Sequence, residues 1–156
     1  MNNKYLIGST ILIVPLIFSL FFFRIPVIEI QADQNTYFIR DNSFILSWVH
    51  SVEKEPWYEV YERQKDKLVL TETYFKTFGA GVPSNLEIID KKDGFVHMNV
   101  DRTVDELNVI VSENVQTTIT IGEKDIKLYE IVEPYSEVSF FVKELHLWNL
   151  FEGEFL

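Results

Sequence analysis

The stretch that decides the fold lies at residues 44–50 and reads FILSWVH. Aromatic and β-branched side chains dominate it, which is typical of a largely buried β-strand. On both sides, short segments with alternating apolar and polar residues follow one another, separated by turn signals such as Asp93-Gly94 and Gly122. The predicted strands are 27–30, 44–50, 57–63, 68–75, 95–100, 107–112, 117–121, 124–132 and 137–142.

Short strands at this spacing predict an all-β fold, either a single β-sandwich or a small barrel of about eight or nine strands. We place this domain at residues 25–144. An apolar C-terminal tail at residues 145–156 follows it. The tail either packs on the sandwich as a last strand or short helix, or faces a partner.

The N-terminal residues carry the signal for a membrane segment. Residues 5–23 contain no charged side chain and lie between Lys4 and Arg24. This length is close to the roughly 20 apolar residues that cross a bilayer as a helix. The bulky residues before Arg24 do not fit a cleavage site, so an uncleaved anchor is preferred over a secretory signal. We therefore expect a cytoplasmic tail at 1–4, a transmembrane anchor at 5–23, and a single-pass plasma-membrane protein whose C-terminal domain lies outside the cytoplasm.

Composition excludes several classes of function. The chain of 156 residues has 24 acidic and 14 basic side chains, a net charge of −10 that argues against a nucleic-acid surface. It has no cysteine, which excludes disulfides, thiolate metal sites and a cysteine nucleophile. The three histidines, His50, His97 and His146, are scattered rather than set at ligand spacing. No metal and no cofactor is predicted.

Residues 50–59 form the densest polar cluster. His50 beside Ser51 suggests a hydrolase, but neighbours in a strand point to opposite faces. The chain also has no Gly-x-Ser-x-Gly motif, so no catalytic residue is predicted. The run FGAGVPS at 78–84 has two glycines that permit close backbone approach. It is either a loop that meets a ligand or partner, or a crossover between sheets, which is the preferred interpretation.

Two carboxylates stand within apolar alternations. Glu59 shares its predicted face with Trp57 and Tyr61, and Glu72 shares the face of Leu68, Leu70 and Tyr74. A buried carboxylate requires a partner. That partner is either a ligand cation or a side chain of the domain such as Arg102, Arg63 or His50, and pairing within the domain is preferred. If these faces turn outward, both carboxylates are solvated.

Several of these motifs resemble one bacterial family. The runs HSVEK at 50–54, P-x-x-E at 56–59, E-T-x-F at 72–75 and FGAGVP at 78–83 are similar to Domain of Unknown Function 1850, a group of short exported or membrane-anchored proteins. The resemblance implies an accessory role beside a tripartite ATP-independent periplasmic (TRAP) transporter, because members are often encoded beside its components. It carries over eight motif residues without assigned roles: His50, Ser51, Glu53, Glu59, Glu72, Gly79, Gly81 and Pro83.

Together these observations predict a non-catalytic, membrane-anchored extracytoplasmic accessory protein. Its expected partner is an integral membrane component of a TRAP-type solute transporter, or the solute-binding protein of that transporter. The expected contact surface draws on the eight motif residues and combines the 50–59 segment with the 79–83 loop at one end of the sandwich, where loops gather. The alternative is a stand-alone small-ligand-binding or sensor domain, in which the acidic residues face a cationic or hydroxylated solute. A hydrolase ranks third.

Overall fold

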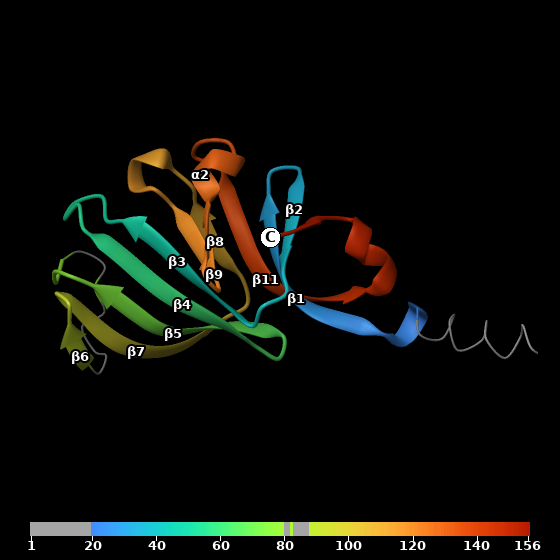
Figure 1. The fold of residues 1–156 in the computed structure, drawn as a ribbon, viewed down its shortest axis with the longest axis horizontal. Helices are drawn as coiled ribbons and strands as arrows, with labels where there is room; N and C mark the ends of the chain where they lie inside the picture. Colours follow the sequence, from blue (N-terminus) through green and yellow to red (C-terminus); the bar gives the residue numbers. More distant parts are fainter. Residues whose placement is uncertain (1–19, 80–81, 83–87) are drawn as a thin grey trace, which may run out of the picture.

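The alternating segments pair into two sheets that face each other across an apolar core (Figure 1). The computed structural model describes residues 20–79, 82 and 88–156. The strands are β1 Arg24–Ala32, β2 Asn35–Ile39, β3 Ser43–Val49, β4 Pro56–Gln64, β5 Lys67–Phe75, β6 Ile88–Lys92, β7 Phe95–Val104, β8 Leu107–Ile110, β9 Thr118–Ile121, β10 Lys124–Lys127, β11 Glu137–His146 and β12 Glu154–Phe155. The five-stranded sheet has the order β12-β2-β1-β11-β8, and the seven-stranded sheet the order β10-β9-β3-β4-β5-β7-β6. The expected all-β sandwich is therefore observed.

Stacked aromatic rings join the two sheets through the core. Phe44 of β3 lies 5.3 Å from Tyr61 of β4 and 5.1 Å from Phe140 of β11, measured between ring centroids. All three side chains are buried. Ring pairs at such distances contribute about 0.5–1.5 kcal/mol each beyond the area they bury. This stack explains why the aromatic strand at 44–50 is central to the fold.

A second apolar cluster lies on the inner face of the seven-stranded sheet. It contains Trp57, Phe75, Val96 and Met98. The Trp57 indole N–H donates a 2.9 Å hydrogen bond to the hydroxyl of Thr73, which satisfies the polar atom of a buried ring. This cluster supports the turn and loop that carry several of the motif residues.

All nine predicted strand segments contain a strand, but the estimate of eight or nine strands was too low. The described residues contain twelve, because β2, β6 and β12 were not predicted. The sequence of β2 begins with two polar residues, that of β6 ends with three charged ones, and β12 has only two residues. None of them shows the long alternation on which the prediction depended.

The predicted strand at 124–132 is wrong in its second half. The strand β10 ends at Lys127, and α2, Leu128–Ile131, forms a single helical turn. Leu128 is fully buried in the main core, and its backbone N–H donates to the carbonyl of Thr117 at 3.0 Å. Burial of Leu128 thus overrides the strand propensity of the segment.

The C-terminal residues complete the outer face of the five-stranded sheet. The strand β11 continues to His146, the 3-10 helix η2 spans Leu147–Phe151, and β12 pairs in parallel with β2. The ring of Phe155 lies 5.3 Å from that of Phe38, beside a buried cluster that includes Leu145. The tail expected at 145–156 therefore packs on the sandwich.

Most of the predicted anchor at 5–23 lies outside the described residues. Of its C-terminal part, residues 20–22 are helical and Phe23 leads into β1. Within the described part of the chain, no helix is both long enough and apolar enough to cross a membrane.

Candidate functional site

Three of the motif residues meet where the turn after β3 approaches the loop after β5. The turn is closed by two backbone hydrogen bonds, from His50 N to Glu55 O at 2.8 Å and from Lys54 N to His50 O at 2.9 Å. Within it, Nδ1 of His50 contacts the carboxylate of Glu53. The backbone of Gly79 lies directly against that carboxylate, so a side chain at position 79 would overlap it. We refer to this arrangement as the His50–Glu53–Gly79 contact.

The His50–Glu53–Gly79 contact leaves almost no room for a ligand. The imidazole of His50 stacks on Trp57, with 5.8 Å between ring centroids. The remaining space between the turn and the loop is about 10 Å³, roughly enough for one water molecule. The side chains of His50 and Glu53 therefore fill the space between the turn and the loop, and they join these two segments above the second apolar cluster.

The other residues expected at this end of the sandwich have different surroundings. Ser51 is exposed in the turn, whereas the ring of His50 is directed toward Trp57 and Glu53. Gly81 and Pro83 lie outside the described residues.

Glu59 lies on the inner face of β4, as its alternation with Trp57 and Tyr61 predicted. The hydroxyl of Tyr61 donates a 2.6 Å hydrogen bond to Glu59 Oε2. Burial raises the pKa of the Glu59 carboxyl, and the Tyr61 hydrogen bond and the charge of Arg102 oppose this rise. Burial, together with the Glu59 carboxylate, also raises the pKa of Tyr61. The Glu59 carboxylate thus points inward and has its partners within the domain, namely the Tyr61 hydroxyl and the charge of Arg102. Arg102 was one of the partners that the sequence suggested.

Glu72 does not share the face of Leu68 and Leu70, and this prediction is corrected. The pairing of β4 with β5 shifts between Val60 and Tyr61, so that Val60 faces Glu72 while Tyr61 faces Leu70. The extra residue, Thr71, forms a β-bulge that reverses the alternation in the rest of β5. Thr73 and Phe75 therefore point inward, and Glu72 and Tyr74 point outward.

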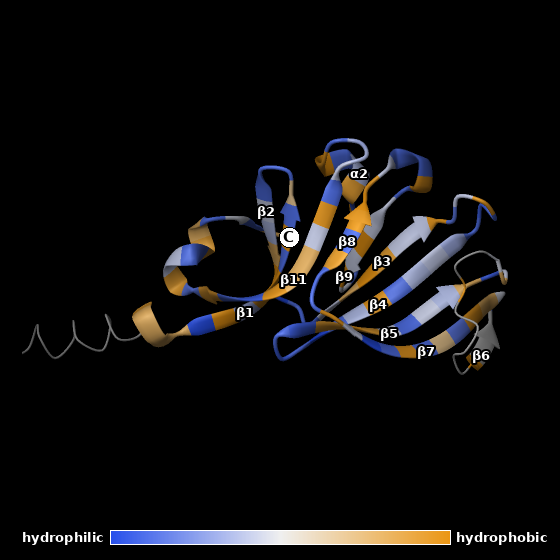
Figure 2. Cartoon of the chain, turned by 180° about the vertical axis from the view of Figure 1, so that it is seen from behind, coloured by the Kyte–Doolittle hydropathy of each residue, from blue (hydrophilic) through white to orange (hydrophobic). Residues whose placement is uncertain are grey.

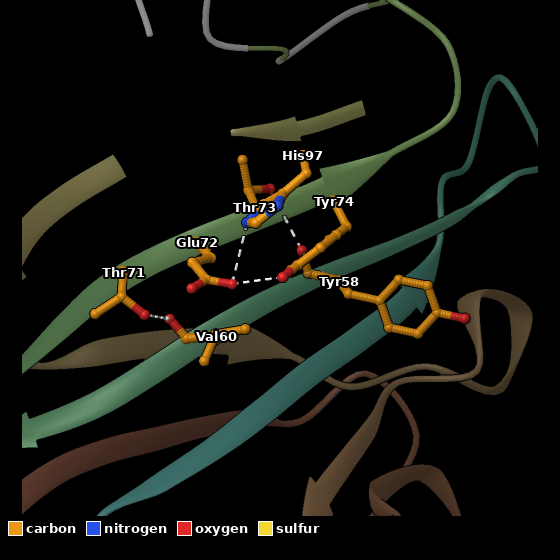
Figure 3. Close-up of polar contacts among 7 residues, drawn as sticks. All are labelled: Tyr58, Val60, Thr71, Glu72, Thr73, Tyr74 and His97. Carbon is orange, nitrogen blue, oxygen red and sulfur yellow. Dashed lines mark hydrogen bonds and ion pairs between the residues drawn. The ribbon is translucent and has the colours of Figure 1, made fainter. Parts of the chain in front are cut away.

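Although it faces outward, Glu72 has close partners (Figure 3). Its Oε2 lies 3.1 Å from Nε2 of His97 and accepts a 2.5 Å hydrogen bond from the Tyr74 hydroxyl. The rings of Tyr74 and His97 are stacked with centroids 4.2 Å apart. The partner is therefore His97 of β7 rather than Arg102, Arg63 or His50.

These residues border a groove on the outer face of the seven-stranded sheet. Tyr58, Tyr74 and His97 stand directly opposite one another on β4, β5 and β7, which places their side chains in one cross-strand row. The hollow beside the row has a volume of about 570 Å³. Its lining, which defines the outer groove, is Ile45, Tyr58, Val60, Tyr74, Asp93, Phe95 and His97.

The outer groove combines apolar walls with a polar edge. The rings of Tyr58 and Phe95 form an edge-to-face pair with centroids 5.6 Å apart, and the ammonium of Lys76 lies 5.1 Å from the Phe95 centroid. Asp93 lines the groove, and Glu72 supplies a second carboxylate next to His97. Aromatic walls with a few convergent polar groups are the usual chemistry of a binding site for small organic molecules or protruding side chains.

Sequence reasoning missed this groove and most of its residues. Tyr58 and Val60 alternate against inward residues of β4, so their outward direction was predictable. The groove itself depends on the bulge at Thr71, which brings Tyr74 opposite Tyr58. Among the described residues, no group of three or more histidine, aspartate or glutamate side chains lies close enough to hold a metal ion.

Comparison with known proteins identifies one family. A family model described as "Domain of unknown function (DUF1850)" matches residues 44–128. No curated protein and no solved structure matches the chain. The matched residues include β3, β4, β5, β7, β9 and β10, and therefore both the His50–Glu53–Gly79 contact and the outer groove.

Proposed function

Because this chain belongs to the DUF1850 family, we propose that it is a non-catalytic binding protein, tethered at the outer face of the plasma membrane, that acts as an accessory to a solute transporter. Its partner would be an integral membrane component of a TRAP-type transporter or the solute-binding protein of that transporter. The outer groove is the surface that binds this partner.

The observation that carries this proposal is the outer groove itself. With a volume of about 570 Å³, it falls in the range of about 300–1,000 Å³ typical of binding sites. Apart from Asp93 in the turn between β6 and β7, its lining residues come from four adjacent strands of the sheet, so the site is built mainly on rigid elements. At the His50–Glu53–Gly79 contact, by comparison, the side chains of His50 and Glu53 leave no space for a ligand.

Tethering is supported by the N-terminal residues. The 19 uncharged residues at 5–23 fit the length of a bilayer-spanning helix. An anchor raises the local concentration of the domain near other membrane proteins, so a weak contact through the groove is sufficient.

Crosslinking in native membranes tests the proposal. Tagged full-length protein is crosslinked, purified and analysed by mass spectrometry. The test variant is Val60→Arg, which places a long charged side chain in the middle of the groove. The matched control is Glu62→Arg, which places the same side chain two positions along the same outward face of β4, where Glu62 is exposed.

We expect wild type and Glu62→Arg to capture a transporter subunit or its solute-binding protein, and Val60→Arg to lose it. If wild type captures no transporter component, the accessory role is wrong. If Val60→Arg captures as much as wild type, the groove is not the contact surface. Circular dichroism of each variant checks that the fold is retained.

The size of the groove and its polar edge also favour a second function, a stand-alone module that binds a small cationic or hydroxylated solute. In that case a solute would raise the melting temperature of the purified chain without any partner, by an amount that grows with solute concentration. Val60→Arg would abolish this shift and Glu62→Arg would preserve it.

A further inference from the structure

A group of exposed aromatic side chains gathers where the N-terminal residues meet η2. Phe21 and Trp148 form an edge-to-face pair with ring centroids 5.4 Å apart, although the two residues lie at opposite ends of the chain. The exposed fraction is 61% for Phe21, 43% for Trp148 and 92% for Phe151. Phe22 and Phe23 are also exposed. We call these five residues the basal aromatic cluster.

The cluster is held in place by the opposite side of η2. Leu150 packs on the buried cluster of Val27, Phe38 and Leu145, and the imidazole of His146 stacks on the Trp148 indole with centroids 4.3 Å apart. Figure 2 shows hydrophobic colouring on the helical residues before β1 and on parts of η2, at the end of the molecule opposite β6. The exposed rings therefore belong to a packed element of the sandwich.

The position of the cluster along the chain points to a lipid bilayer as its binding partner. Residues 20–23 are the last part of the uncharged segment 5–23, so the cluster lies where a membrane anchor would leave the bilayer. Tryptophan concentrates at the boundary between hydrocarbon and headgroups, and segments that lie in this boundary carry tryptophan, phenylalanine and leucine on their buried face. Glu152 follows η2 and is exposed, whereas Glu144 forms an ion pair with Arg24 at 3.4 Å, so the local charge does not favour an anionic lipid surface.

We propose that η2 docks into the interfacial layer of the same bilayer that holds the anchor, with Trp148 and Phe151 inserted among the lipid headgroups. The domain then has two membrane contacts, the chain at Phe23 and the turn at Trp148, so it is oriented rather than freely rotating. This inference rests on the tethering in the proposed function. It places the basal aromatic cluster at the membrane and the β6–β7 end of the sandwich away from it (Figure 1).

The test uses the full-length chain reconstituted into phosphatidylcholine vesicles that contain brominated lipids, which quench nearby tryptophans. Bromines are placed either close to the headgroup or deep in the acyl chains. Because Trp48 and Trp57 also fluoresce, the signal of Trp148 is taken as the difference between wild type and Trp148→Phe. Flotation with the vesicles and resistance to carbonate extraction report insertion of the anchor independently.

We expect Trp148 emission to be quenched more strongly by the shallow bromines than by the deep ones. Phe151→Glu should reduce this quenching, because loss of one inserted aromatic ring lowers the ratio of docked to undocked domain by about tenfold. The matched control is Val52→Glu, which changes another exposed apolar residue (71% exposed) on the 50–55 turn and should leave the quenching unchanged.

Three outcomes would overturn the inference. If the chain floats with the vesicles and resists extraction but shallow bromines quench wild type and Trp148→Phe equally, the tether holds and η2 does not dock. If Val52→Glu reduces quenching as much as Phe151→Glu, the effect is not specific to the cluster. If the chain does not float at all, the tethering in the proposed function fails, and the docking of η2 fails with it.

Discussion

Adding a methyl group at Gly79 is expected to destabilise the domain through one specific neighbour, Glu53. A Cβ built on Gly79 would overlap the Glu53 carboxylate and lie 2.5 Å from its Cδ, well inside van der Waals contact. The backbone does not oppose the substitution, because among the described glycines only Gly94 and Gly122 have positive φ angles. The effect of Gly79→Ala therefore depends almost entirely on whether Glu53 can move.

The magnitude follows from what Glu53 loses when it moves. Its carboxylate contacts His50 in a space with almost no spare volume, so rotation breaks that contact or shifts the loop. Overpacking of this kind costs about 1–3 kcal/mol. In a Glu53→Ala background the obstacle is gone, and Gly79→Ala should stabilise by about 0.4–1 kcal/mol, because alanine reduces the freedom of the unfolded chain. The two positions should thus be coupled by about 1.4–4 kcal/mol.

Urea unfolding of wild type, the two single variants and the double variant measures this coupling, with tryptophan emission as the signal because Trp57 lies beneath the turn. A parallel cycle with Glu62→Ala in place of Glu53→Ala serves as the control and should be additive within about 0.5 kcal/mol. If Gly79→Ala costs the same with and without the Glu53 side chain, the His50–Glu53–Gly79 contact does not hold the turn and loop together.

Three further predictions concern the core and the C-terminal segment. Burial raises the pKa of Glu59 above its usual 4.5, so the stability that its protonated form supplies is present below that value and lost as pH rises through the raised pKa. Since glutamine cannot ionise, Glu59→Gln should gain stability relative to wild type in urea titrations as pH rises above 4.5, and a difference independent of pH would contradict the burial of this carboxylate. Gly153→Ala should lower the free energy of unfolding by about 2–3 kcal/mol, because the added Cβ would lie 2.6 Å from the ring of Phe38 and 2.7 Å from the backbone oxygen of Thr36, which cannot rotate away. In thermal unfolding, Gly153→Ala should therefore lower the melting temperature more than Gly79→Ala does. Phe44→Leu should lower the free energy of unfolding by about 1–3 kcal/mol through the loss of its two ring pairs. Phe151→Leu, at a highly exposed position, should change it by less than about 0.5 kcal/mol. Equal effects of the two leucine variants in chemical denaturation would show that the aromatic stack does not stabilise the core.

The strands that sequence alone predicted are those with long alternation and aromatic or β-branched residues, such as 44–50 and 68–75. Their pairing partners, however, are set by tertiary contacts. The bulge at Thr71 has no compositional signal, since threonine is an ordinary strand residue, and it was enough to move Glu72 to the opposite face of the sheet. Register errors of one residue have this consequence because side chains alternate with a period of two.

The candidate site, like the fold, was predictable from the sequence only in part. The prediction placed the turn at His50 and the glycine loop at one end of the sandwich, and Glu53 does contact Gly79 there. Sequence reasoning could not show that these residues fill their own space. It also considered three partners for Glu72 and omitted His97, which lies 25 positions away on a strand whose neighbour was not evident from the sequence.

The pairing of β1 with β11 determines when the domain can finish folding. These adjacent strands are joined from Arg24 opposite His146 to Ala32 opposite Val138, so the partners of the first strand are up to 122 positions away in the chain. A growing polypeptide can assemble β3, β4 and β5 early, since these consecutive strands pair with one another. The inner aromatic face of that sheet then stays uncovered until the last twenty residues are synthesised. Such distant pairing slows folding, and a chain that is terminated early, before β11, would expose Phe44 and Tyr61 to chaperones, proteases and aggregation.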